Sequence, residues 1–137
     1  MAKFTSFLKN QQQINSAKVI IVDPSLNFRV RISEEKMQEV GKLYGTEDRD
    51  RISGLIKIIE ESDVHDRVGS GVAASDISSN DFEPREGIYL FSKDGEIYKF
   101  LFSKKYEGAS TVQGSFNGRP ITARSSIPRA LQSWVDE

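Results

Sequence analysis

The sequence predicts an α+β fold, in which one antiparallel sheet of five or six strands packs with helices. Hairpin patterns indicate the sheet: two lie in the C-terminal half of the chain and one lies near the N-terminus. Helical periodicity over residues 34–62 and near both ends of the chain indicates the helices. With 137 residues and no internal repeat, the chain has the length of a single domain, 1–137.

Residues 87–103 are the most informative segment. They predict two strands joined by a turn at 93–95, and both strands are apolar at nearly every position. A strand with one wet face alternates between apolar and polar residues, whereas a strand covered on both faces does not. We therefore expect this hairpin at the centre of the sheet, with a layer packed on each side.

The N-terminal segment predicts a helix followed by a hairpin. The apolar residues at helical spacing are Phe4, Phe7, Leu8, Ile14 and Ala17. They predict an amphipathic helix over 3–16. Residues 18–23 and 28–32 predict two strands, joined by a turn that contains Pro24.

Two helices are predicted next, over 34–44 and 47–62. Ser33 and Thr46 are suitable N-caps, and Gly45 is a suitable residue to end the first helix. The short junction predicts that the helices form a tight pair on one face of the sheet. The terminal helices then cover the other face or the ends of the sheet.

A hairpin near the C-terminus is predicted by the dipeptide Asn117-Gly118, which favours a two-residue turn between strands 111–116 and 119–124. Pro120 has no N–H to donate to a neighbouring strand. The second strand is therefore an edge strand, or its outer neighbour starts after Pro120.

Two segments complete the chain. Residues 63–86 are rich in Ser, Asp and Gly and predict a mobile loop that links the two halves of the domain. Residues 126–135 predict a short final helix, with Ile127, Leu131 and Trp134 on its apolar side.

Catalytic and metal-binding patterns are weak. The chain has no cysteine and one histidine, His65, which excludes thiol chemistry and argues against a structural zinc site. An enzyme of unrecognised type centred on His65 and the 63–86 loop, with a hydroxyl such as Ser70 as nucleophile, is one alternative, but no nucleophile elbow or triad pattern surrounds these residues. The acidic residues of 76–86 miss the spacing of a calcium loop. We expect no enzymatic activity, no cofactor and no metal.

A group of basic residues interleaved with aromatic ones lies between positions 98 and 129, where six Lys and Arg accompany a single acidic residue. The candidate binding residues are Lys99, Lys104, Lys105, Tyr106, Arg119 and Arg124. Cations around aromatic rings on a sheet are typical of single-stranded nucleic-acid binding. The competing interpretation is that Tyr98, Phe100 and Phe102, at period two, form the core side of a strand.

The function predicted from these patterns is a non-enzymatic interaction module: an adaptor, inhibitor or regulator that binds another protein. A homodimer is a second form of the same hypothesis if the helices leave one face of the sheet uncovered. The alternative is a nucleic-acid-binding protein that uses the residues between 98 and 129, which the isoelectric point of about 5.9 disfavours. No signal peptide or membrane-spanning segment is visible, so a cytoplasmic location without membrane attachment is expected.

Overall fold

The computed structural model describes residues Phe7, Lys9, 11–23, Leu26, 32–66, 83–103, Gly108 and 110–136. Its strands are β1 (Ile14–Ile21), β2 (Lys42–Thr46), β3 (His65–Asp66), β4 (Pro84–Ser92), β5 (Ile97–Ser103), β6 (Thr111–Phe116) and β7 (Arg119–Arg124). Its helices are α2 (Glu34–Val40), α3 (Arg49–Glu61) and α4 (Ile127–Asp136), with a 3-10 turn η1 (Gln11–Gln13).

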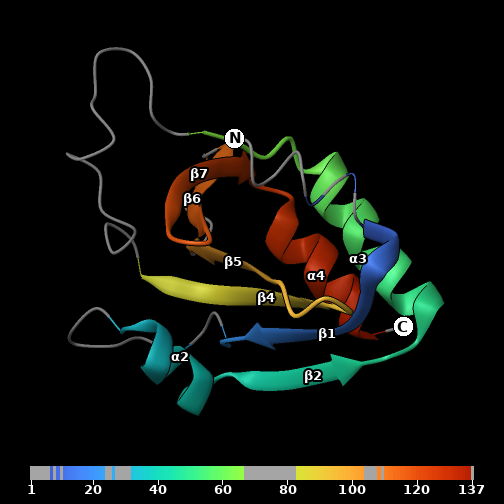
Figure 1. Ribbon diagram of the computed structural model, residues 1–137. Coiled ribbons are helices and arrows are strands. Elements are labelled where there is room, and N and C mark those ends of the chain that lie inside the picture. The colour runs from blue at the N-terminus through green and yellow to red at the C-terminus, as the bar shows by residue number, and fades with distance from the viewer. Residues whose placement is uncertain are drawn as a thin grey trace.

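The strands form one sheet in the order β2-β1-β4-β5-β6-β7-β3, and every neighbouring pair is antiparallel. Among the described residues, six strands have at least five residues and β3 has two. The predicted α+β fold with a five- or six-stranded antiparallel sheet is confirmed. The sheet bends, so that β6 and β7 rise beside α4 (Figure 1).

The central hairpin is confirmed as β4 and β5, and both of its faces contribute to a hydrophobic core. Register pairs Leu90 with Tyr98 and Gly87 with Leu101. Leu90 and Tyr98 belong to a large core under α3 and α4, whereas Leu101 belongs to a smaller core under α2. Because successive side chains of a strand point to opposite faces, the unbroken apolar sequence serves two separate cores.

The larger core lies between the sheet and the helices α3 and α4, which share one face (Figure 1). Helix α3 contributes Ile52, Leu55, Ile56 and Ile59, and α4 contributes Ile127, Leu131 and Trp134. Trp134 joins the two helices because its Nε1–H donates to the Arg51 carbonyl, 2.8 Å away. The Arg51 guanidinium returns a hydrogen bond to the Trp134 carbonyl and stacks 4.2 Å from the ring centroid.

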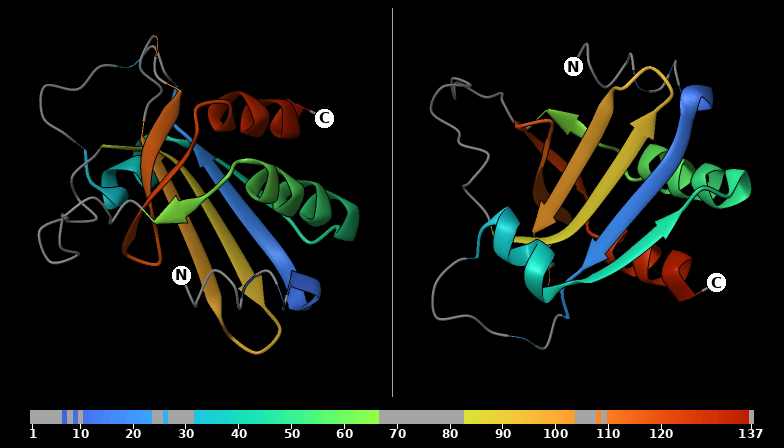
Figure 2. Two further views of the ribbon diagram at one scale, coloured as in Figure 1. Left: turned by 90° about the horizontal axis from the view of Figure 1, so that it is seen from above. Right: turned by 60° about the horizontal axis from the view of Figure 1, so that its bottom comes forward.

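The smaller core lies on the opposite face, under α2. It contains Ile20, Val22, Ile32, Met37, Tyr89 and Leu101. Met37 packs where Gly87 leaves room, since a Cβ at Gly87 would lie 3.0 Å from the Met37 methyl carbon. Helix α2 crosses one end of the strands, and no described helix or strand covers the rest of this face (Figure 2, right).

The predicted helix over 3–16 is wrong at its C-terminal end, because β1 begins at Ile14. A β-bulge lies between Ile14 and Ser16, where the register against β4 shifts. The bulge places Ile14 and Ala17 in the same core although they are three residues apart. The spacing that resembled a helix therefore arises from an irregular strand. Phe7 and Lys9 are helical, as predicted.

The predicted helix over 34–44 is wrong beyond Val40, and the two helices do not pair. Chain reversal occurs at Gly41, where a Cβ would lie 2.6 Å from Ile20 and 2.8 Å from the Met37 carbonyl oxygen. The next five residues form the edge strand β2, which separates α2 from α3 and sends them to opposite faces. Asp48, not Thr46, is the N-cap of α3.

Two further predictions fall partly outside the described residues. The partner strand predicted at 28–32 is described only at Ile32, which is not in a strand, and β1 instead pairs with β2 and β4. The segment 63–86, predicted as a loop, contains β3 and the first residues of β4; its residues 67–82 lie outside the described part of the chain.

The C-terminal hairpin and helix are confirmed. Phe116 pairs with Arg119, and Asn117 and Gly118 have φ values of 48° and 85°, as a type I′ turn requires. On its outer side β7 pairs with β3 through Ile121 and Thr122. The outer neighbour thus begins after Pro120, which was one of the two arrangements predicted.

Candidate binding site

The structure describes three of the six predicted binding residues and does not gather them into one patch. Lys104, Lys105 and Tyr106 lie outside the described residues. The Lys99 ammonium lies on the α2 side of the sheet and forms an ion pair with Glu34 at 2.9 Å. Its charge is therefore already neutralised within the chain.

Arg119 and Arg124 occupy the two ends of β7 and project from opposite faces of the sheet. Arg119 pairs with Phe116, whose side chain lies in the larger core, so Arg119 shares that face. Arg124 pairs with Thr111. It is an odd number of residues from Arg119 in the same strand, so its side chain points to the opposite face. Arg119 and Lys99 are thus on different faces, and a single flat ligand does not contact both.

His65 lies in β3 at the edge of the sheet and is exposed. One ring nitrogen, Nδ1, is 2.8 Å from the Asp63 carbonyl oxygen, and the other, Nε2, is 2.9 Å from the Thr122 hydroxyl. Both ring nitrogens therefore have partners within the β3–β7 corner. Its proposed nucleophile, Ser70, lies outside the described residues.

A groove of about 390 Å³ lies on the α2 side of the sheet, over β1. Its volume is at the lower end of the range for ligand sites, ~300–1,000 Å³. Two strands and α2 surround it, and it is lined by Lys18, Ile20, Gln38, Leu43, Tyr89 and Phe91. Leu43 is 60 % exposed. Ile97 of β5 is on the same face, where it pairs with Phe91, and is 50 % exposed, but it does not line the groove. We call this the β1 groove.

Lys18 supplies the positive charge of the β1 groove. Register places it between Gly45 of β2 and Tyr89 of β4. Its ammonium lies 5.7 Å from the centroid of the Phe91 ring. Among the residues that the structure describes, no carboxylate forms an ion pair with Lys18. The sequence holds one signal of this position: Lys18 precedes four consecutive apolar residues and marks where the cover of α2 ends.

The closed end of the β1 groove is fixed by Glu34, the first residue of α2. Its Oε1 binds the Lys99 ammonium at 2.9 Å, and its Oε2 accepts a hydrogen bond from the Tyr89 hydroxyl at 2.8 Å. The Gln38 amide donates to the same hydroxyl at 3.1 Å. Burial raises the pKa of Tyr89 to about 12. The Gln38 amide lowers this pKa, and Glu34 raises it. Tyr89 therefore acts as a neutral donor that holds α2 to the sheet.

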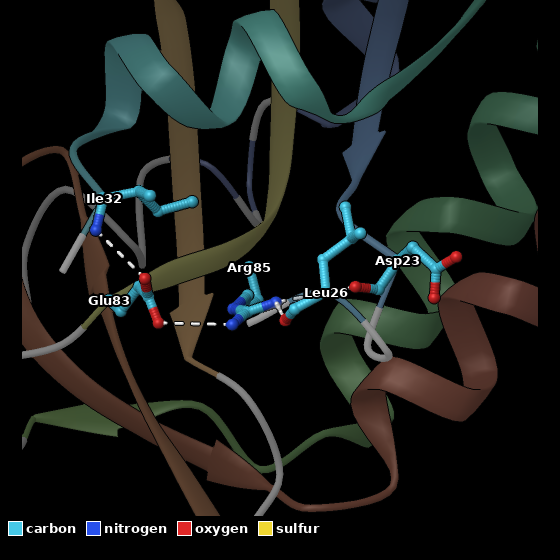
Figure 3. A network of polar contacts seen from close by, with 5 residues as sticks. All are labelled: Asp23, Leu26, Ile32, Glu83 and Arg85. Atoms are coloured by element: carbon cyan, nitrogen blue, oxygen red, sulfur yellow. Dashed lines mark hydrogen bonds and ion pairs between the residues drawn. The ribbon is translucent and has the colours of Figure 1, made fainter. Parts of the chain in front are cut away.

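A buried arginine, Arg85, contacts Leu26 and Glu83 in a polar network near the start of β4 (Figure 3). The Arg85 side chain is 5 % exposed, and its Nη1 donates to the Leu26 carbonyl at 3.0 Å. Its Nη2 contacts Glu83 Oε2 at 3.3 Å, while Glu83 Oε1 accepts the Ile32 N–H at 3.0 Å. Leu26 and Ile32 are thereby held to the start of β4, and Ile32 immediately precedes Ser33, the N-cap of α2.

Glu86 follows Arg85 in β4 and has a buried carboxyl group. It is 7 % exposed and pairs with Ile21 and Phe102, which direct it to the side of the larger core. Within the described structure its Oε2 has no hydrogen-bond partner. Burial raises the pKa of Glu86 to about 8, although the neighbouring Arg85 guanidinium lowers it. Glu86 does not line the β1 groove.

Among the described residues, no cluster of three or more His, Cys, Asp or Glu side chains has the arrangement of a metal site. Within the same part of the chain, no helix is long and apolar enough to cross a bilayer. Comparisons with protein-family models, with curated proteins and with solved structures give no match to this chain. The geometry of the β1 groove is therefore the main guide to function.

Proposed function

We propose that this chain is a non-enzymatic, cytoplasmic protein-binding module that docks its partner on the α2 side of the sheet. One observation carries the proposal: α2 covers only one end of this face and leaves Leu43 and Ile97 exposed. Full burial of a side chain of this size is worth about 1.5–3 kcal/mol. A partner that covers both residues gains that driving force.

The rest of the molecule supports the same conclusion. The opposite face of the sheet is occupied by α3 and α4, which bury their apolar residues there. Of the three large hydrophobic residues that are exposed in the described structure, two lie on the α2 side. Ile97 pairs with half-buried Phe91, which lines the groove, so the apolar surface of this face extends beyond the groove. The only histidine lies in β3, at the far edge of the sheet from the groove.

Affinity capture from cells of the source organism tests this proposal. The tagged chain is compared with a double variant, Leu43→Asp with Ile97→Asp, and with Leu26→Asp as a matched control. Leu26 is 41 % exposed and does not line the groove. We expect a protein partner that binds the wild type and the control but not the double variant, with all three folded by circular dichroism. A partner retained by the double variant, or no specific partner, contradicts the proposal.

A further inference from the structure

We propose that the β1 groove recognises a peptide segment of the partner in which an acidic residue lies within two positions of a large apolar residue. This inference rests on the proposed protein-binding function and names the chemistry of the bound segment. Three features of the groove lead to it: an ammonium without an ion pair among the described residues, an apolar floor and an open approach from the edge strand.

The ammonium of Lys18 determines the sign of the ligand. The carboxylate of Glu34, which contacts the Tyr89 hydroxyl at the end of the groove, already binds Lys99 as well. A carboxylate in the groove would therefore meet Lys18 without competition from Glu34. Ile20 and Phe91 lower the local polarity, and an ion pair in such surroundings is stronger than one on an open surface.

The apolar part of the ligand is determined by the other lining residues. Ile20 is buried in the floor, Phe91 is half-buried on one side, and Leu43 stands exposed on the other. A large apolar side chain that enters the groove removes part of this apolar surface from water. The Gln38 amide and the Tyr89 ring close the end of the groove below α2.

Gly45 leaves the approach to Lys18 open. It is the cross-strand neighbour of Lys18 on β2, and a Cβ built there would have no atom nearer than 3.9 Å. β2 is the terminal strand of the sheet, so its outer edge has no neighbour among the described strands. A peptide lying along this edge projects alternate side chains over the α2 side, and one opposite Gly45 reaches toward Lys18.

A nucleic acid fits this site less well than an acidic peptide. Binding of a phosphate backbone requires several cations in a row. In the described part of this face, Lys99 is already paired with Glu34, which leaves Lys18 as the cation of the groove. One positive charge beside an apolar floor matches one carboxylate next to one apolar side chain.

Selection from a random peptide library displayed on phage tests the inference. Against the wild-type chain we expect enrichment of Asp or Glu within two positions of Leu, Ile, Phe or Trp. Lys18→Glu is expected to replace the acidic preference with Lys or Arg. Lys57→Glu, on the exposed face of α3, is the matched control and is expected to retain the wild-type preference. A synthetic enriched peptide should bind Lys18→Ala about two- to fivefold more weakly.

Enrichment of uncharged or basic peptides by the wild type, no enrichment, or an acidic preference that survives Lys18→Glu would overturn the inference. So would binding of a labelled single-stranded oligonucleotide that depends on Lys18. The proposed function is judged separately: a cellular partner lost with Leu43→Asp and Ile97→Asp but retained by Lys18→Glu supports docking on this face and excludes acidic recognition.

Discussion

Two adjacent residues of β4 show how differently the fold treats buried charge. Arg85 donates from Nη1 and Nη2 to oxygen acceptors, namely the carbonyls of Asp23 and Leu26 and the Glu83 carboxylate. Glu86, whose side chain lies beside the larger core, has an oxygen without a hydrogen-bond partner in the described structure. The first charge is compensated by hydrogen bonds, and the second is removed by protonation.

The buried Glu86 makes stability depend on pH. Its pKa is about 8 in the folded chain and 4.5 when exposed, so the folded state holds a proton that the unfolded state has released. The free energy of unfolding should therefore fall by about 1.4 kcal/mol per pH unit as pH rises between these values. Glu86→Gln is expected to remove this slope and to be more stable than wild type at pH 8, as measured by urea titrations from pH 5 to 8. Equal slopes for wild type and Glu86→Gln, with exposed Glu60→Gln as control, would contradict the assignment.

Removal of Arg85 should be strongly destabilising. Arg85→Met leaves Glu83 as a part-buried carboxylate without its guanidinium and leaves the Leu26 carbonyl without its donor. Breaking a buried pair from one side typically costs about 3–5 kcal/mol. Arg129→Met, at an exposed position of α4, is expected to change stability by about 0.5 kcal/mol or less. Chemical denaturation of both variants measures the difference; similar midpoints would show that the network contributes little.

At the scale of elements, the sequence patterns predicted strands and turns more reliably than helix boundaries. The apolar hairpin at 87–103 and the turn at Asn117-Gly118 were predicted because their signals are local. The bulge after Ile14 and the chain reversal at Gly41 were not, because both depend on contacts with residues distant in sequence. An i, i+3 pattern does not distinguish a helix from a bulged strand.

The binding site was less predictable than the fold. Composition directed attention to cations between 98 and 129, but a sequence pattern does not show that Lys99 is paired with Glu34, 65 residues away. Lys18 and Leu43 become neighbours on one groove only through strand order and register. Nucleic-acid binding through Lys104, Lys105 and Tyr106 stays a prediction.

Two glycines test the corrected boundary between α2 and β2. Gly41→Ala places a Cβ against Ile20 and the Met37 carbonyl and is expected to lower the free energy of unfolding by about 1–3 kcal/mol. Gly45→Ala enters open space in a strand and is expected to be neutral or to stabilise by up to about 1 kcal/mol. Thermal unfolding compares them directly. If Gly45→Ala were the more damaging change, the result would favour the helix predicted over 34–44, which ends at Gly45, over the observed boundary at Gly41.

In the whole molecule, the described helices cover one face of the sheet more completely than the other. The face under α3 and α4 is packed along its length, whereas α2 occupies one end of the other face (Figure 2). A second copy of the chain would compete with another protein for the uncovered area, because a homodimer was predicted if the helices leave one face of the sheet uncovered. Native mass spectrometry at micromolar concentration distinguishes a monomer, which leaves the β1 groove free, from a homodimer whose contacts are lost with Leu43→Asp.

The strand order also affects local unfolding of the molecule. β2 and β3 form the two opposite borders of the sheet, yet only α3 and short connections separate them in the chain. If α3 detaches transiently from the sheet, β2 and β3 lose the helix that connects them. We therefore expect the two strands to unfold locally together, as one cooperative unit. Amide hydrogen exchange should therefore speed up by a common factor in β2 and β3 when Leu55→Ala weakens α3, with a smaller change in β4 and β5. Acceleration confined to one border would show that the two margins open independently.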